Sequence, residues 1–276
     1  MDRAHEQVRP LLKSRKPDRE LEAGARAHFE DAAYYSATYR TRVEDVAFYS
    51  RIAKGVPALL EYGIGNGRIA LPIARGGTSV TGVDHSAPML ADLRRRVRAE
   101  RLPITAKRGD MRRTKLGARF PLVLCPFNTM LHLYGRADVE AWLDRVKEHL
   151  LPGGELVFDV AMPMVEDLAR DPSVPFKTPP FRHPTLGRVT YREHFDYDRA
   201  RQILFVAMSF GTASGEVMTP LAHRQFFPQE LEALLHYNGF AIQALMGDFE
   251  GNPLVSTSEV IVVRAKRRTR SGRGSA

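Results

Sequence analysis

Residues 59–74, with the sequence LLEYGIGNGRIALPIA, pass from an apolar run through three alternating glycines into a helix-like pattern. Glycine permits positive φ angles and lets the backbone approach a ligand without an intervening Cβ. The helix that follows begins with unpaired N–H groups and with the positive end of its dipole. A strand, a glycine turn and a helix in this order predict a ligand-binding turn at the end of a strand.

From Ala58 onward, apolar segments of strand length alternate with amphipathic segments of helix length. Ser86 is a suitable N-cap for one helix, and the apolar stripe from Val139 to Leu150 marks another. This alternation predicts a doubly wound parallel sheet with helices on both faces. The segments that we assign to its first five strands are Ala58–Tyr62, Ser79–Val83, Ile104–Arg108, Pro121–Pro126 and Glu155–Val160.

The pattern changes after Ala161. Residues 163–184 are rich in proline and have no clear period, and residues 189–212 indicate two strands joined by a turn. A further helix from Pro228 and two more strands, Phe240–Gly247 and Ser258–Ala265, end the pattern. We therefore expect four parts: an N-terminal helical cap (1–57), a core (58–162 and 226–266), a substrate-binding insertion or lid (163–225) and a disordered basic tail (267–276).

The net charge of +9 is concentrated at one end of the chain. Residues 264–276 hold six basic residues and no acidic one, which leaves 35 basic and 32 acidic residues elsewhere. Because this tail has no aromatic residue for base stacking, we expect a solvated end rather than a nucleic-acid-binding arm.

Cysteine usage and hydropathy indicate the compartment. The single cysteine, Cys125, excludes an internal disulfide and a cysteine-based zinc site. The first twenty residues lack the apolar core of a signal peptide, and no apolar run is long enough to span a membrane. We expect a cytoplasmic protein with no membrane partner and no metal.

The second strand ends in Asp84, on the connection that neighbours the glycine turn in a doubly wound sheet. An acid there can accept hydrogen bonds from both hydroxyls of a ribose. The dinucleotide fingerprint, however, requires a small residue at the position of Arg68, for close helix–strand packing around a pyrophosphate. The two features together predict a nucleoside-bearing cofactor other than NAD.

Glu61 followed by Gly63, Gly65 and Gly67 resembles the first motif of class I S-adenosylmethionine-dependent methyltransferases. Four later stretches resemble the family in the same order: VTGVDHSAPML, RGDMR, LVLCPFNTMLHL and HLLPGGELVFDV. The resemblance extends from about residue 34 to residue 266. It implies a Rossmann-like seven-stranded sheet, mostly parallel with the last strand antiparallel, an N-terminal helical cap and a β insertion before the last helix.

The resemblance also implies how the cofactor, S-adenosylmethionine, is held. Glu61 suits its ammonium group, Asp84 its ribose and Asp110 its adenine amino group, with Met111 packed on the ring. The cofactor-binding residues that it implies are Tyr39, Glu61, Gly63, Gly65, Asn66, Gly67, Asp84, His85, Met89, Asp110, Met111 and Phe127.

Two finer matches indicate a small-molecule subgroup. The loop CPFNTMLHL, residues 125–133, resembles a pattern of amino-sugar and glycine-type N-methyltransferases, with Pro126 as a departure. Tyr34, Tyr35 and Tyr39 lie in a cap of the kind that closes over the cofactor. His132 is the candidate base, because its place after the fourth strand puts it near the methyl donor by analogy; a purely structural role is the alternative.

The sequence thus predicts transfer of a methyl group to a nitrogen or oxygen of a small-molecule acceptor by in-line displacement. Aromatic and cationic side chains of the insertion, such as Phe181, His183 and Tyr191, suit an anionic or aromatic acceptor. The motif N/D-P-P-Y/F and a catalytic Pro-Cys dipeptide are both absent, which weighs against nucleic-acid methylation. An RNA methyltransferase that uses the basic tail and a non-catalytic binding protein remain alternatives, and a homodimer is compatible with the sequence.

Overall fold

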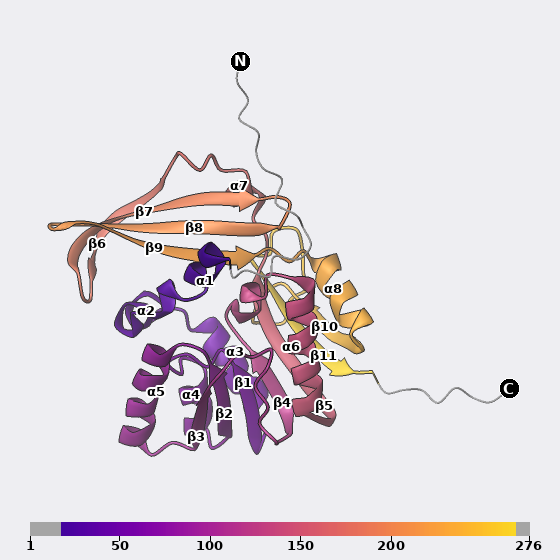
Figure 1. Cartoon of the computed structure of the whole chain (residues 1–276). Helices are drawn as coiled ribbons and strands as arrows, with labels where there is room; N and C mark the ends of the chain where they lie inside the picture. Colours follow the sequence, from indigo (N-terminus) through magenta and orange to yellow (C-terminus); the bar gives the residue numbers. More distant parts are fainter. Residues whose placement is uncertain (1–17, 269–276) are drawn as a thin grey trace.

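The computed structural model describes residues 18–268, which form two β-sheets with helices packed around and between them (Figure 1). The strands are β1 (Ala58–Tyr62), β2 (Ser79–Asp84), β3 (Ile104–Arg108), β4 (Phe120–Cys125), β5 (Leu150–Ala161), β6 (Phe176–His183), β7 (Gly187–Asp198), β8 (Ile203–Thr212), β9 (Gly215–Arg224), β10 (Phe240–Met246) and β11 (Val260–Arg267). The helices are α1 (Arg19–Gly24), η1 (Ala27–Phe29), α2 (Ala32–Thr38), α3 (Glu44–Ala53), α4 (Ala70–Arg75), α5 (Ala87–Glu100), η2 (Thr129–His132), α6 (Arg136–His149), α7 (Val165–Leu168) and α8 (Pro228–Tyr237).

The larger sheet has seven strands in the order β10-β11-β5-β4-β1-β2-β3. Strand β1 pairs in parallel with β2 and β4, β2 pairs in parallel with β3, and β4 with β5. Strand β11 runs antiparallel to both of its neighbours, β5 and β10. The mostly parallel sheet with an antiparallel last strand, as predicted from the sequence, is confirmed.

Both faces of this sheet are buried, as the apolar character of its strands requires. On β1, Leu59 packs in one layer with residues of α3, α4 and α5, while Leu60 packs in the other with residues of α6 and α8. Helix α5 begins where the sequence indicates, since the Ser86 hydroxyl accepts a hydrogen bond from the Met89 N–H at 3.3 Å. Trp142, at the centre of the α6 stripe, is fully buried. Two packed layers therefore hold the parallel strands, and with them the loops at their carboxyl ends, in place.

The insertion forms a second sheet of four antiparallel strands in the order β6-β7-β8-β9. The sequence predicts only two of them, β7 and β8. The edge strands were missed because each contains proline: Pro179 and Pro180 in β6, and Pro220 in β9. Proline lacks the N–H that a central strand needs, so it is confined to sheet edges, and the β6–β7 register shifts at this point.

Helices α1 and α2 lie between the two sheets (Figure 1), and the short η1 contacts β9. Gly24 of α1 packs so closely on β9 that a Cβ there would be 2.6 Å from Cβ of Ala222. Tyr34 of α2 stacks on His183 of β6, with ring centroids 4.4 Å apart. The cap is therefore packed against the insertion as well as against the core. Residues 1–17 of the expected cap lie outside the described residues.

Strand β11 runs to Arg267, two residues beyond its predicted end. The Arg264 guanidinium donates to both carboxylate oxygens of Glu155, at 3.0 and 2.7 Å. The first part of the basic segment thus belongs to the sheet, whereas residues 269–276 of the expected tail lie outside the described residues. Within residues 18–268, none of the helices combines the length and the apolar character that a membrane crossing needs.

Candidate active site

A cavity of about 450 Å³ lies among the glycine turn, the loops that follow β2, β3 and β4, and the cap. Its volume falls within the range of small-molecule sites. Among the cofactor-binding residues and the candidate base predicted from the sequence, all but two line it; the exceptions are Tyr39 and Gly67. The lining residues from that set are Glu61, Gly63, Gly65, Asn66, Asp84, His85, Met89, Asp110, Met111, Phe127 and His132.

The glycine turn follows β1 with positive φ angles at Gly63 (70°) and Gly65 (52°). A Cβ on Gly63 would be only 2.3 Å from the Thr129 hydroxyl oxygen, so any side chain at this position would collide with the loop after β4. The Gly65 N–H donates to Oδ2 of Asp84 at 2.8 Å. The turn is thus held by Asp84 on one side and presents bare backbone to the cavity on the other.

Glu61 lies at the end of β1 and is 2 % exposed. Its Oε2 is buried and has no hydrogen-bond partner within the described part of the chain. Burial raises the pKa of Glu61 well above its ordinary value, the nearby Asp84 raises it further, and Arg68 opposes both. A buried, unpartnered carboxylate is costly in the absence of a cation. Since Glu61 also lines the cavity, this oxygen is suited to receive a cationic ligand group.

Arg68, the residue that disfavours a pyrophosphate, does not neutralise Glu61. Its two terminal nitrogens donate to the two carboxylate oxygens of Asp45, at 2.8 and 2.6 Å. A bidentate pair of this kind is among the stronger side-chain interactions. Arg68 is therefore committed to the wall of the cavity, and the carboxylate of Glu61 remains available.

Asp84, at the end of β2, accepts one backbone hydrogen bond on each oxygen, from Gly65 N and Ser86 N, both at 2.8 Å. Each carboxylate oxygen keeps a further lone pair for a ligand hydroxyl. The neighbouring His85 contacts the cap, with Nε2 3.2 Å from the Ala25 carbonyl oxygen. This end of the cavity thus offers acceptors for a diol beneath the cap.

Asp110 is less free than the sequence indicates. The Arg112 guanidinium donates to both of its oxygens, at 2.7 to 3.0 Å, and also binds Asp138. Burial raises the pKa of Asp110, but the hydrogen bonds from Arg112 outweigh it and the net shift is downward. Arg112 and Asp138 both line the cavity. Neither residue was predicted from the sequence, although Arg112 stands two residues after Asp110 in the RGDMR motif.

The two predicted residues outside the lining have other contacts. The Tyr39 hydroxyl lies 3.0 Å from Nε2 of His28, and its ring packs edge-on against Phe127 at 4.7 Å. Tyr35, one helical turn earlier, lines the cavity in its place. A Cβ on Gly67 would lie 2.5 Å from Cδ1 of Leu93, inside the apolar core. Gly67 thus serves helix packing behind the turn.

His132 lies on η2 and contacts Phe29 of the cap and His223 of β9, with ring centroids 5.4 and 5.1 Å away. Burial, followed by the nearby histidines, lowers its pKa well below the ordinary value. The Tyr134 hydroxyl donates to the Ala222 carbonyl at 3.0 Å, and its oxygen lies 3.4 Å from Nδ1 of His132. Burial keeps the imidazole neutral, and a neutral imidazole has one ring nitrogen that can accept a hydrogen bond.

The lining is acidic although the whole chain is basic. Among the described residues it holds six carboxylates and three guanidiniums, and Arg112 and Arg68 are themselves paired with carboxylates. Such a surface favours cationic ligands. The acidic lining residues are Asp18, Glu22, Glu61, Asp84, Asp110 and Asp138, and the arginines are Arg26, Arg68 and Arg112.

The insertion does not supply the cationic and aromatic lining that we expected from the sequence. Within residues 18–268, no residue between 163 and 225 lines the main cavity. Phe181 and Tyr191 instead pack around Tyr34 in a separate apolar cluster. His183 and Phe210 border a second, smaller cavity of about 180 Å³ between the cap and the insertion. Among the same residues, no group of three or more His, Cys, Asp or Glu side chains is arranged to hold a metal.

Comparisons with known proteins agree with this geometry. Residues 59–154 match the family model of a methyltransferase domain. The chain is 34% identical over 121 residues to the dTDP-3-amino-3,6-dideoxy-alpha-D-glucopyranose N,N-dimethyltransferase of Streptomyces fradiae, across 44% of this chain and 46% of that enzyme. The chain thus spans less than half of the length of the curated relatives that it matches.

Two solved structures share the architecture over most of the chain. The CcbJ methyltransferase from Streptomyces caelestis superposes with a TM-score of 0.73 at 22% identity, over 89% of this chain and 99% of that one. CalS10, an amino pentose methyltransferase from Micromonospora echinaspora, gives a TM-score of 0.63 at 23% identity, over 84% and 96%. These similarities establish the fold. The resemblance seen in the sequence is confirmed, with the family match confined to residues 59–154.

Proposed function

We propose that this chain, whose residues 59–154 match the family model of a methyltransferase domain, transfers a methyl group from S-adenosylmethionine to a nitrogen of a small-molecule amine. The observation that carries the proposal is the unpartnered Oε2 of Glu61, buried beside a glycine turn in an acidic cavity. S-adenosylmethionine has an ammonium group and a sulfonium, both cationic, and no pyrophosphate. The predicted cofactor and the charge of the site therefore agree.

The cavity residues fit the parts of this cofactor in chain order. Glu61 would accept a hydrogen bond from the ammonium group, while the backbone at Gly63 and Gly65 would border the amino-acid end. Asp84 would bind the ribose hydroxyls through its remaining lone pairs. Asp110 would share its carboxylate between Arg112 and the adenine amino group, with Met111 against the ring. The cofactor supplies an activated methyl group, and the protein supplies alignment.

The acidic lining favours an amine acceptor over an anionic one. Amines are cationic in water, so the excess of acidic over basic residues in the lining would favour them at the site. The amine must lose its proton to solvent before it attacks, because a histidine with a lowered pKa is a weak base for an ammonium ion. We therefore assign His132 an orienting role. Its Nε2 accepts a hydrogen bond from the N–H of the substrate amine, and this directs the lone pair of the amine nitrogen at the methyl group.

Three finer features belong to the same proposal. The acceptor is a small molecule, and no nucleic acid is required: Arg264 to Arg267 are part of β11, and Arg264 is paired with Glu155. The chain acts in the cytoplasm, where S-adenosylmethionine is made. The insertion acts as a lid through its contacts with the cap, and the function is compatible with a homodimer.

Transfer of a ¹³C-labelled methyl group from S-adenosylmethionine tests this function. The acceptors are amino sugars, each paired with the sugar that carries a hydroxyl in place of the amine. We expect N-methyl products from the amino sugars and at least a tenfold lower rate with each hydroxyl partner. Equal rates on both would contradict the amine assignment. Binding of the cofactor without transfer to any acceptor would support the non-catalytic alternative.

A further inference from the structure

The loop that follows β4 has an unusual backbone. Phe127 and Asn128 are consecutive non-glycine residues with positive φ angles, 52° and 62°. This region is uncommon for non-glycine residues, and for a bulky residue such as Phe127 it is strained. A strained pair persists only where several surrounding contacts impose it. Phe127 also lines the main cavity, so the contacts that impose the strain bear on the proposed site.

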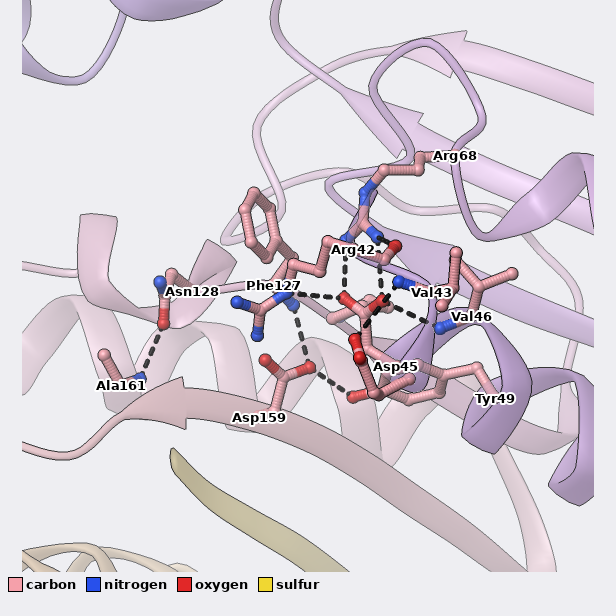
Figure 2. A network of polar contacts seen from close by, with 12 residues as sticks. Arg42, Val43, Asp45, Val46, Tyr49, Arg68, Phe127, Asn128, Asp159 and Ala161 are labelled. Carbon is pink, nitrogen blue, oxygen red and sulfur yellow. Dashed lines mark hydrogen bonds and ion pairs between the residues drawn. The ribbon is translucent and has the colours of Figure 1, made fainter. Parts of the chain in front are cut away.

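The first set of contacts comes from the end of β5 (Figure 2). Oδ1 of Asp159 accepts hydrogen bonds from the Phe127 N–H at 2.8 Å and from the Tyr49 hydroxyl at 2.6 Å. The Asp159 carbonyl accepts from the Asn128 N–H at 3.2 Å. The Asn128 side chain in turn accepts from the Ala161 N–H at 2.6 Å. Two successive residues of the loop are thereby attached to one strand.

The second set holds the Phe127 ring. The guanidinium carbons of Arg68 and Arg42 lie 4.5 and 4.9 Å from the ring centroid, within the distance of a cation–π interaction. Both arginines are ion-paired with Asp45, which is fully buried. Figure 2 shows the two carboxylates, Asp45 and Asp159, in one network of polar contacts around Phe127. One carboxylate fixes the Phe127 backbone and the other fixes the cations that contact its ring.

We propose that Asp159, together with Tyr49, is a positioning residue for methyl transfer; this rests on the proposed function. Neither residue is among those that line the described cavity, so both act through the loop. The loop carries Phe127, Thr129 against the glycine turn, and His132 one helical turn later. A shift of the loop would move all three relative to the methyl donor, and a displacement of about 1 Å can cost as much as about 100-fold in rate.

Burial supports the role of Asp159 as a fixed acceptor. The side chain is 1 % exposed, so the Phe127 N–H and the Tyr49 hydroxyl have no water to replace it. Removing an acceptor from buried donors carries a desolvation penalty that an exposed hydrogen bond does not. Asparagine at this position keeps an oxygen that can accept both hydrogen bonds, whereas alanine keeps none. The two substitutions therefore separate the hydrogen bonds from the mere presence of a side chain.

The test compares Asp159→Ala, Asp159→Asn and Tyr49→Phe with the wild type, with Asp196→Ala on the exposed face of β7 as a matched control. We expect Asp159→Ala to lower kcat by about 10–100-fold with the Kd of S-adenosylhomocysteine changed less than about threefold. Asp159→Asn should restore kcat to within about threefold of wild type, and Tyr49→Phe should fall between the two. Melting temperatures identify any variant that fails to fold.

Hydrogen exchange of the Phe127 amide gives a readout that does not depend on catalysis. The amide should be protected in the wild type and in Asp159→Asn, and should exchange at least tenfold faster in Asp159→Ala. Faster exchange together with an unchanged kcat would overturn the positioning role and leave a structural one. A wild type with a protected amide but no methyl transfer would refute the proposed function, while the hydrogen bonds from Asp159 to the loop would still be supported.

Discussion

Glu61→Gln is expected to weaken binding of S-adenosylhomocysteine while it makes the ligand-free protein more stable. The ligand keeps the ammonium group of the cofactor, and a hydrogen bond to an ionised acceptor is worth about 1.5–3 kcal/mol, which corresponds to roughly a 10–150-fold loss of affinity. Glutamine has nearly the same shape and can still accept a hydrogen bond, but it carries no charge. In the ligand-free protein, the substitution removes a buried carboxylate that has no partner on Oε2.

The pH dependence of stability should change in the same variant. Burial raises the pKa of Glu61 in the folded protein well above its ordinary value of 4.5. Between these two pKa values the folded state binds a proton that the unfolded state has lost, so Glu61 destabilises the fold as pH rises through this window. The wild type should therefore lose stability relative to Glu61→Gln above about pH 4.5.

Calorimetry with S-adenosylhomocysteine and thermal melts from pH 4.5 to 8 measure the two effects. Glu232→Gln, on an exposed position of α8, is the control and should change neither quantity. An unchanged ligand affinity in Glu61→Gln would show that Glu61 does not bind the ammonium group. Lower stability of this variant at pH 8 would show that Glu61 has a favourable partner in the folded protein.

His132→Phe is expected to lower kcat by about 100-fold, since the orientation of the acceptor depends on the hydrogen bond to Nε2. Phenylalanine preserves the aromatic contacts with Phe29 and His223 but offers no acceptor. The affinity for S-adenosylhomocysteine should stay within about threefold of wild type, because the proposed role concerns the acceptor alone. A second variant, His132→Asn, keeps a side-chain acceptor and should recover part of the rate.

The pH profile distinguishes orientation from base catalysis at His132. Burial, with the nearby histidines, holds its pKa well below 6.5, so the imidazole is neutral throughout the neutral range. The wild-type kcat should then show no acid limb from this group near pH 6.5, and His132→Phe should have a parallel profile. A wild-type limb near pH 6.5 that disappears in His132→Phe would contradict the orienting role. Full activity of His132→Phe would leave only a structural one.

The core of the fold could be predicted from the sequence because its signals are local. The spacing of apolar residues in β1 to β5 and in α5 and α6 follows from burial of one or both faces. The N-cap of α5 is equally local, because the Ser86 hydroxyl accepts from the Met89 N–H three residues later. The edge strands β6 and β9 could not be predicted, since a proline is compatible with a strand only at an edge. Which strands form the edges depends on pairing between distant segments.

The three glycines of the turn show the corresponding limit for the site. They are equivalent in the sequence, yet Gly63 makes room for Thr129, Gly65 donates its N–H to Asp84, and Gly67 makes room for Leu93. The partners are 19 to 66 residues away, so spacing alone does not separate ligand contact from packing. Three-dimensional contacts also decide that Arg112 binds Asp110. They likewise decide that Tyr35, and not Tyr39, lines the cavity.

Titration of the wild-type protein with S-adenosylhomocysteine and, separately, with NAD tests whether this cavity holds S-adenosylmethionine by its amino-acid end. We expect one molecule of S-adenosylhomocysteine to bind per chain with a Kd in the micromolar range, about −8 kcal/mol, and NAD to bind at least a hundredfold more weakly. The low affinity for NAD follows from Arg68 at the position where a dinucleotide site requires a small residue. Binding of NAD in preference to S-adenosylhomocysteine, or binding of neither, would show that the cavity is not a site for S-adenosylmethionine.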